Sequence, residues 1–319
     1  MRALVLGAGG FVGRHLVRYL RENSDEVACG VLSADDEVAG CLNVIADITI
    51  PETIRDAVDQ FKPEVVYLLA GMAFVPEAEK NLESAIRVNV LGAANVARIC
   101  AEKLPSDGAL VFASSAEVYG AISATDLPIT EETPVRPANN YSLSKIMGEL
   151  AVERYCRPRS DMRQVIVRPF NHIGAGQDAR FVSANFARQL AMIAHGLHEP
   201  IISVGNLEAK RDFSDVRDVV RAYRLLAEKA SGIFNVGSGT CVSINDILAN
   251  LVAISGLKVS IQQDPTRMRS SEVPEIYGTT EKIAKACGWT VQIPLSETLE
   301  ELYDFWHQKI KNEKVVAAI

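Results

Sequence analysis

Short apolar runs rich in β-branched residues alternate with longer segments of helical spacing through the first half of this 319-residue chain. Turn or capping residues follow each run, and apolar side chains three and four residues apart mark the longer segments. This alternation is typical of βαβ units, whose parallel sheet is buried on both faces by helices. We therefore expect a doubly wound α/β fold. The expected strands are 3–6, 27–32, 44–46, 65–69, 110–113 and 164–167, and the expected helices are 11–21, 51–61, 82–103 and 141–155.

The pattern of expected elements changes after Phe170, where glycine-rich turns separate shorter strands and helices. We interpret residues 1–170 as a nucleotide-binding Rossmann domain. Residues 171–319 are interpreted as mainly a smaller α/β substrate-binding domain, with some segments returning to the first domain. Helices are expected here at 184–196, 243–255 and 295–308, and short strands at 201–204 and 232–236.

Composition excludes several classes of protein. Hydrophobic residues make up 48% of the chain and charged residues 23%, close to the averages of globular proteins, which excludes disordered and collagen-like chains. The apolar runs are shorter than the roughly 20 residues that span a membrane. A net charge of −7, without a run of lysine or arginine, disfavours a nucleic-acid partner.

The first residues and the cysteines bear on the cellular compartment. The chain opens directly on a strand, without a charged leader and apolar stretch, which predicts a cytoplasmic protein. Its six cysteines are scattered and none stands at metal-ligand spacing from another. We therefore expect reduced thiols and no metal site.

Residues 7–13 read Gly-Ala-Gly-Gly-Phe-Val-Gly, directly after the first expected strand and at the start of the first expected helix. Glycine lets the backbone approach a pyrophosphate, whose charge is stabilised at a helix N-terminus. The same glycines would also suit a tight turn with close packing of helix on strand. In this context we favour a dinucleotide site, with contacts from Gly7, Gly10, Phe11, Val12 and Gly13.

The end of the second expected strand bears on the choice of cofactor. A protein that binds NAD usually has an acid there, which binds the ribose 2′-hydroxyl. Here the residue is Ser33, Asp35 and Asp36 follow beyond it, and Arg14 lies near the glycine loop. The missing acid favours NADP(H), with NAD(H) as the alternative.

Tyr141 and Lys145 stand four residues apart at the start of an expected helix, so both project from one face. A phenol with a pKa near 10 is a poor acid–base group at neutral pH until a nearby ammonium favours its phenolate. Alone, the pair would also fit a solvated lysine beside a half-buried tyrosine. Ser114 and Ser115, however, end an expected strand, at the edge where open α/β sheets bind ligands. The combination favours an acid–base site.

The ordered set of glycine motif, Ala70-Gly71, Asn89, Ser115, Tyr141 and Lys145 resembles the extended short-chain dehydrogenase/reductase family over the whole chain. The resemblance implies that Ser115 hydrogen-bonds the reacting oxygen, that Tyr141 exchanges a proton with it, and that Lys145 lowers the pKa of the tyrosine and holds the nicotinamide ribose. It also implies homodimers formed through the two long helices. Further cofactor contacts implied by the family are Asp47, Ile48, Ala70, Gly71, Asn89 and Phe170, with a capping role as the alternative for Asp47.

In the second half, the same resemblance implies a sugar-nucleotide site. Two arginines would bind the diphosphate, and an inter-domain salt bridge is the alternative for each. Three stretches of the second half resemble the sequences of the family members that reduce GDP-4-keto-6-deoxy-D-mannose to GDP-D-rhamnose with NAD(P)H. They are residues 171–177, Phe181-Val182 and residues 204–208. The implied substrate contacts are Ser115, Asn171, Val182, Arg211, Arg269 and Glu272.

Glu117 leaves a second interpretation open. Relatives that dehydrate GDP-mannose place a glutamate two residues after the catalytic serine or threonine, where it removes a proton from the sugar, and Glu117 has this spacing from Ser115. Alternatively, Glu117 is a carboxylate at the rim of the site that does not act as the base. A GDP-mannose 4,6-dehydratase or another nucleotide-sugar epimerase or dehydratase is therefore an alternative activity, and a non-catalytic dinucleotide sensor is a remote one. The configuration at C4 of the product, rhamnose or talose type, stays open.

Overall fold

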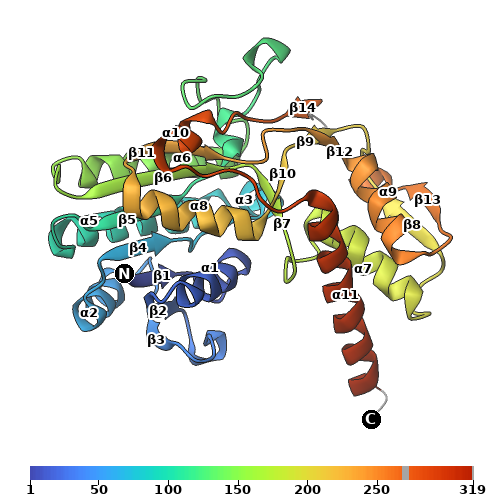
Figure 1. The fold of residues 1–319 in the computed structure, drawn as a ribbon, viewed down its shortest axis with the longest axis horizontal. Coiled ribbons are helices and arrows are strands. Elements are labelled where there is room, and N and C mark those ends of the chain that lie inside the picture. Colours follow the sequence, from blue (N-terminus) through green and yellow to red (C-terminus); the bar gives the residue numbers. More distant parts are fainter. Residues whose placement is uncertain (268–272, 318–319) are drawn as a thin grey trace. The chain divides into compact units, whose positions relative to one another are not determined.

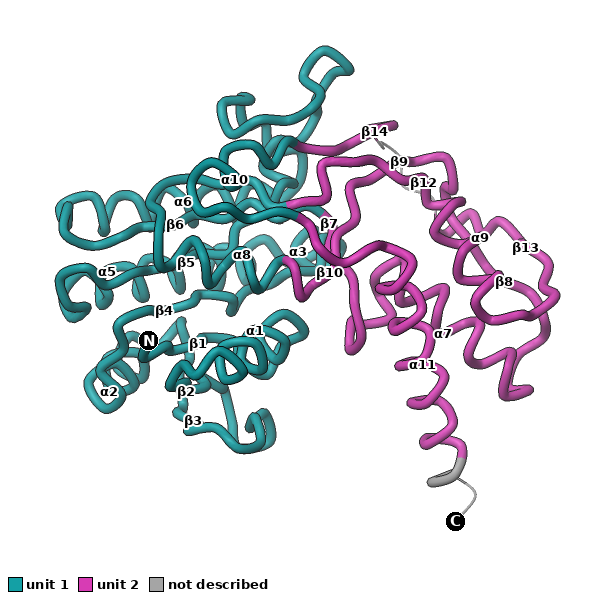
Figure 2. Tube along the Cα trace, viewed as in Figure 1, with its two compact units in different colours: residues 1–170, 219–236, 279–290 teal, residues 171–218, 237–278, 291–319 magenta. Residues whose placement is uncertain are grey.

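The computed structural model describes residues 1–267 and 273–317, and the chain divides into two compact units (Figure 2). Unit 1 comprises Met1–Phe170, Val219–Val236 and Thr279–Thr290, and unit 2 comprises Asn171–Asp218, Gly237–Gly278 and Val291–Ile319. None of the helices in the described residues is long and apolar enough to cross a membrane.

Unit 1 is built on a seven-stranded parallel sheet of order β11-β6-β5-β4-β1-β2-β3 (Figure 1). Chain order reverses at β1, which pairs with β2 on one side and with β4 on the other. This arrangement confirms the expected doubly wound α/β fold, in which ligands bind outside the carboxyl ends of the strands at the reversal. The strands are β1 (Arg2–Leu6), β2 (Glu26–Val31), β3 (Leu42–Ile45), β4 (Val65–Leu68), β5 (Ala109–Ala113), β6 (Arg163–Pro169) and β11 (Gly232–Val236).

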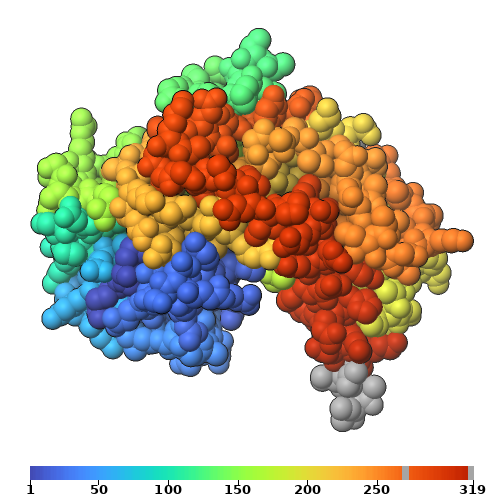
Figure 3. Space-filling model, in the orientation of Figure 1, coloured from blue at the N-terminus to red at the C-terminus, as the bar shows by residue number. Residues whose placement is uncertain are grey.

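Helices cover both faces of this sheet. On one face, α2 (Pro51–Phe61), α5 (Ala93–Lys103) and α6 (Asn140–Cys156) enclose a core with the strands. On the other face lie α1 (Phe11–Glu22) and α8 (Val216–Lys229), and Figure 3 shows the atoms of α1 in blue beside those of α8 in yellow-orange. The buried residues of the first core include Leu4, Leu6, Ile54, Val96, Leu110 and Val152.

Local sequence explains where the helices begin and end. Pro51 occupies the first turn of α2, where its missing N–H costs nothing, and Lys62 ends that helix in a left-handed conformation with φ of 51°. The Asn139 side chain caps α6 by accepting a hydrogen bond from Ser142 N at 2.8 Å. This cap fixes the first turn of the helix that carries Tyr141.

The strand expected at 232–236 is β11, the edge strand of the large sheet, and so is a segment of the second half that lies in unit 1. One expectation about unit 1 requires correction. The single helix expected at 82–103 is three consecutive segments: α4 (Leu82–Ala85), the π-helix η2 (Ile86–Gly92) and α5. A π-turn adds one residue per turn, so apolar spacing alone does not reveal it. The remaining elements of unit 1 are α3 (Val75–Lys80), α10 (Glu281–Cys287), η1 (Ala34–Asp36), η3 (Ala116–Tyr119) and η4 (Ala124–Asp126).

Unit 2 has short strands and three packed helices. Parallel pairs join β7 (Asn171–Ile173) to β10 (Phe213–Asp215) and β8 (Ile201–Val204) to β13 (Ser260–Gln263). Its helices α7 (Val182–Ala194), α9 (Ile244–Ser255) and α11 (Leu295–Ala317) share one core that includes Phe186, Leu190, Leu251, Leu302 and Trp306. The other elements are η5 (Pro265–Arg267) and a small sheet of β12 (Val242–Ser243), β9 (Lys210–Arg211) and β14 (Glu275–Ile276).

Candidate active site

The glycine loop joins β1 to α1 at the carboxyl edge of the sheet. Gly7 has φ of 89°, a conformation that favours glycine, and a Cβ added to it would lie 2.7 Å from Ala70 N. A Cβ at Gly13 would overlap the Gly7 carbonyl oxygen. The loop therefore packs closely on the segment after β4, and the first turn of α1 packs closely on the loop. It leaves backbone rather than side chains at the N-terminus of a 12-residue helix, which suits a pyrophosphate.

The segment after β2 returns to this loop. Ser33 precedes η1, and its Oγ donates a hydrogen bond to Asp36 Oδ2 at 3.1 Å. The Asp36 carbonyl oxygen lies 3.0 Å from where a Gly9 Cβ would be, and Arg14 Nε donates to Gly9 O at 2.9 Å. The sequence predicts that Asp36 lies beyond the ribose position. The 3₁₀ turn η1 folds the chain back, so that the Asp36 backbone lies against Gly9 while its carboxylate bonds Ser33.

Asp47 and Ile48, two of the expected cofactor contacts, follow β3. Asp47 Oδ1 accepts hydrogen bonds from Thr49 N and Thr49 Oγ1, both at 2.8 Å, so its carboxylate stabilises the turn before α2. Ile48 is buried, and a Cβ at Gly92 would lie 2.7 Å from its Cδ1. These contacts give both residues a structural role, and their contact with a cofactor stays a prediction.

The expected acid–base residues lie together in unit 1. Ser115 follows β5, Tyr141 and Lys145 lie on α6, and all three are buried. Burial raises the pKa of Tyr141 to about 12, while a hydrogen bond with Ser115 lowers the pKa and the charge of Glu117 raises it. Tyr141 is therefore a neutral phenol near pH 7, with a serine hydroxyl against it.

Lys145 is held between β5 and α6. Burial lowers the pKa of its ammonium to about 8, and the charge of Glu149 opposes this by raising it. Its Nζ donates to Ala113 O at 2.8 Å and lies 5.3 Å from the centre of the Phe112 ring. A Cβ added to Gly71 would lie 3.4 Å from Nζ, so glycine at that position leaves room beside the ammonium.

Asn89 is buried in the π-helix η2 and ties it to two neighbouring segments. Its Oδ1 accepts from Met72 N at 2.9 Å, and its Nδ2 donates to Met72 O at 3.1 Å and to Ser144 Oγ at 2.9 Å. These bonds link the segment after β4 to α6. The residue thus holds the surroundings of Lys145, and direct contact with a cofactor stays a prediction.

A group that sequence analysis did not find lies behind the serine. Ser114, which the sequence left as a substitute for Ser115, donates its Oγ to Glu149 Oε1 at 2.5 Å. Glu149 forms a buried ion pair with Arg168 of β6. Ser114 is thus engaged away from Tyr141, which favours Ser115 as the serine that acts with the phenol. Two sequence signals point to this group: Glu149 stands four residues after Lys145, and Arg168 is a charged residue in an apolar strand.

Among the described residues, the expected substrate contacts other than Ser115 belong to unit 2. Asn171 lies in β7, Val182 is exposed at the first position of α7, and Arg211 lies in β9, with its Nη1 donating to Lys210 O at 2.7 Å. The adjoining Asp212 is buried and accepts from Ser238 N at 2.6 Å and from Gly239 N at 3.1 Å, which fixes the backbone beside Arg211. Arg269 and Glu272 lie outside the described residues.

Phe170 closes unit 1 at the end of β6. It is buried, and its N donates to Val236 O at 2.8 Å, which ties the end of β6 to β11. Within residues 1–267 and 273–317, no group of three or more histidine, cysteine, aspartate or glutamate side chains could hold a metal ion.

A doubly wound sheet with a glycine-rich first turn, and with a serine, a tyrosine and a lysine gathered at its carboxyl edge, defines the class of nicotinamide-dependent α/β enzymes. Residues 3–237 match the NAD dependent epimerase/dehydratase family. The chain belongs to this family and is an NAD(P)-dependent enzyme.

Individual relatives extend over nearly the whole chain. GDP-6-deoxy-D-mannose reductase of Pseudomonas aeruginosa is 33% identical over 98% of this chain and 99% of that protein. GDP-6-deoxy-D-talose 4-dehydrogenase of Aggregatibacter actinomycetemcomitans is 29% identical over 95% of this chain and 97% of that protein. The structure of RMD from Pseudomonas aeruginosa complexed with NADPH has a TM-score of 0.86 at 32% identity, covering 97% of this chain and 99% of that one.

Proposed function

We propose that this protein reduces the C4 ketone of GDP-4-keto-6-deoxy-D-mannose to GDP-D-rhamnose with NADPH. The observation that carries the proposal is a buried Tyr141 phenol, which burial keeps neutral and whose pKa the Ser115 hydroxyl lowers. A phenol that keeps its proton at neutral pH suits a reduction, which requires an acid. The similarity to GDP-6-deoxy-D-mannose reductase supports the choice of substrate.

The residues divide the chemistry among them. When bound, the reduced nicotinamide supplies the hydride that adds to C4. Ser115 would donate a hydrogen bond to the ketone oxygen, and Tyr141 would transfer its phenolic proton to the same oxygen as negative charge develops there. With a pKa of about 8, Lys145 is charged near pH 7, and its ammonium would stabilise the resulting phenolate.

The residues of unit 2 would hold the sugar nucleotide. Arg211 and Arg269 would bind the diphosphate, since a planar guanidinium matches two phosphate oxygens. Asn171 and Val182 would contact the sugar, and Glu272 the nucleotide ribose. Asp212 supports the role of Arg211, because its bonds to the segment after β11 fix the neighbouring backbone.

NADPH is proposed over NADH because Ser33 stands where an NAD enzyme usually has an acid, and Arg14 is near the glycine loop. Asp36 weakens this preference, since its carboxylate lies beside Ser33 and would repel a 2′-phosphate. The activity is placed in the cytoplasm, where thiols such as the free Cys29 and Cys100 stay reduced.

The test is a direct assay of cofactor oxidation. Purified protein and GDP-4-keto-6-deoxy-mannose would be mixed with NADPH or NADH, and absorbance at the reduced-nicotinamide band followed in each. Stoichiometric loss, faster with NADPH, is the expected result, and Tyr141→Phe should abolish it while still binding NADPH. No loss with either cofactor would refute the reductase.

A dehydratase is the second candidate, favoured by the position of Glu117. This residue is half-buried, and its backbone N–H donates a hydrogen bond to Ser115 Oγ at 3.2 Å. The charge of its carboxylate raises the pKa of the Tyr141 phenol. A base so close to the acid–base pair could remove a proton from the sugar. If GDP-mannose yields the keto sugar without net use of cofactor, and Glu117→Gln abolishes this reaction, the dehydratase replaces the reductase.

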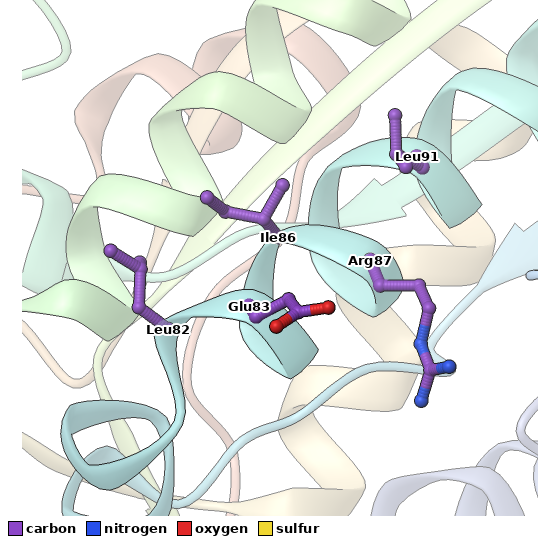
Figure 4. A pocket seen from close by; sticks show the side chains of 5 residues that line it. All are labelled: Leu82, Glu83, Ile86, Arg87 and Leu91. Atoms are coloured by element: carbon purple, nitrogen blue, oxygen red, sulfur yellow. The ribbon is translucent and has the colours of Figure 1, made fainter.

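The protein is also proposed to be a homodimer through the outer face of α4, η2 and α6. Leu91 and Leu150 are 55% and 58% exposed on these neighbouring helices. Figure 4 shows a shallow apolar pocket on this face, lined by Leu82, Glu83, Ile86, Arg87 and Leu91. Exposed leucines on adjacent helices suit a self-complementary contact. Light scattering should give twice the chain mass for wild type and for the control Leu197→Asp in unit 2, and the mass of one chain for Leu150→Asp.

A further inference from the structure

Unit 1 buries an ion pair that the proposed chemistry does not use. Arg168 Nε donates to Glu149 Oε1 at 2.9 Å and its Nη2 to Glu149 Oε2 at 2.6 Å, and both side chains are less than 5% exposed. Removing two charges from water costs free energy, and such pairs often stabilise a fold no more than apolar residues would. The contacts around this pair indicate what it does.

The ion pair holds the chain on both sides of Ser115. Before the serine, Ser114 Oγ donates to Glu149 Oε1 at 2.5 Å. After it, Arg168 Nη1 donates to the hydroxyl of Tyr119 at 3.1 Å, and that hydroxyl donates to Asn235 Oδ1 at 2.7 Å. The turn η3 (Ala116–Tyr119), whose N-cap is Ser115, is therefore held on both sides by one pair of charges.

The same pair belongs to the helix that carries the acid–base residues. Tyr141, Lys145 and Glu149 are spaced four residues apart on α6, so they share one face. They face three consecutive residues at the end of β5 and directly after it: Lys145 donates to Ala113 O, Glu149 accepts from Ser114, and the Ser115 hydroxyl lowers the pKa of Tyr141. The register of α6 against β5 is thus set by three neighbouring polar contacts.

We propose that the Glu149–Arg168 ion pair is a positioning device that sets the distance between the Ser115 hydroxyl and the Tyr141 phenol. The inference rests on the proposed function, in which these two groups act on one oxygen atom. A catalytic hydrogen bond tolerates little displacement, and an error of about 1 Å can cost on the order of 100-fold in rate. Glu149 and Arg168 act through Ser114, Tyr119 and the helix, and they touch no reacting atom.

The pair also acts on Lys145 through charge. Glu149 is the charged group that raises the pKa of this ammonium. From β5, the Ala113 carbonyl and the Phe112 ring face Nζ, Gly71 lies beside it, and these groups carry no titrating charge. The Glu117 carboxylate of η3 acts on Tyr141 instead. Removing the charge of Glu149 leaves the cation of Arg168 unopposed, and both changes lower the pKa of Lys145.

The test compares three variants with a matched control. Ser114→Ala removes the hydrogen bond to Glu149, and Tyr119→Phe removes the hydroxyl that bonds Arg168 and Asn235. Both leave the ion pair intact, whereas Glu149→Gln removes its negative charge. The control is Glu153→Gln, one turn further along α6 and only partly buried. We expect kcat for ketone reduction to fall about 10-fold in Ser114→Ala and Tyr119→Phe and about 100-fold in Glu149→Gln. The KM for NADPH should stay within twofold throughout, and the control should match wild type.

The pH profile separates positioning from a structural effect. In Glu149→Gln the alkaline limb of kcat should move to lower pH, while a merely structural role would lower kcat without moving the limb. If Glu149→Gln fails to fold, the two milder variants decide the question. Unchanged kcat in both of these variants would overturn the proposal.

A readout without substrate distinguishes this proposal from the proposed function. Crystal structures of wild type and Ser114→Ala would give the distance between Ser115 Oγ and Tyr141 Oη. A longer distance in the variant supports the positioning role even if the wild type fails to reduce the keto sugar. An unchanged distance refutes the positioning role even if the reductase assay succeeds.

Discussion

Lys145 and Arg168 are both buried cations near the carboxyl edge of one sheet, yet their surroundings give them opposite properties. Lys145 donates to a neutral carbonyl, and burial lowers the pKa of its ammonium to about 8. Burial would lower the pKa of Arg168 too, but two bonds to Glu149 hold it above its usual range. A buried cation with a full partner keeps its charge as part of the fold, and one without such a partner can lose its charge within the working pH range.

The largest effect is expected from breaking the paired site. Arg168→Met would leave the Glu149 carboxylate buried without its partner, which typically costs about 3–5 kcal/mol of stability. Urea unfolding followed by circular dichroism would measure the loss. The matched control is Arg154→Met, at an exposed position on α6, which should leave the unfolding midpoint near that of wild type. A loss equal to the control's would show that the pairing does not matter to the fold.

The unpaired site should respond in the opposite way. Lys145→Met removes an ammonium that burial destabilises, so the free energy of unfolding should stay the same or rise. The same variant should lower kcat for ketone reduction by at least about 100-fold, since the phenolate of Tyr141 loses its cation. Stability and turnover would be measured on one preparation. A large loss of stability would show that Lys145, like Arg168, is a cation that the fold needs.

The pH dependence sharpens the contrast between the two cations. The pKa of Lys145 is about 8 in the folded protein and 10.5 without perturbation, so the unfolded chain binds the extra proton between these values. Stability is therefore lowered below pH 8 and recovers as pH rises from about 8 to about 10.5. Turnover should fall around pH 8, where the folded protein loses the ammonium. Lys145→Met should show neither the recovery of stability nor this fall in turnover.

The smallest effect is expected at an exposed ion pair. Arg159 and Asp161 lie at the surface and are joined at 2.7 Å, close to the distances within the Glu149–Arg168 pair. Water and salt screen such a pair, so Asp161→Asn should shift the unfolding midpoint far less than Arg168→Met. A shift as large as that of Arg168→Met would mean that burial does not explain the contrast.

The local elements of the sheet were predictable from the sequence because their signals are local. The helix expected at 51–61 matches α2 in full, since Pro51 and the left-handed Lys62 mark its ends. The expected strands 65–69 and 110–113 differ from β4 and β5 by one residue at an end. Apolar runs and capping residues report on a few neighbouring positions, and these elements depend on little else.

The features of the site that could not be predicted from the sequence depend on contacts between residues far apart in the chain. Asp36 reaches the glycine loop only through the turn of η1. The Glu149–Arg168 pair joins a helix to a strand, and Tyr119 meets Asn235 across 116 residues. A single sequence shows that Arg168 is charged and sits in an apolar strand, but not which acid neutralises it.

The return of the chain to its first unit has a consequence for synthesis on the ribosome. Strand β11 and the segment up to Thr290 complete unit 1, but they are translated after residues 171–218 of unit 2. Until β11 emerges, β6 is a bare sheet edge, which other nascent chains can pair with. Maturation of the nucleotide-binding unit therefore waits for almost the entire polypeptide, and a messenger truncated after codon 170 should yield an aggregating fragment.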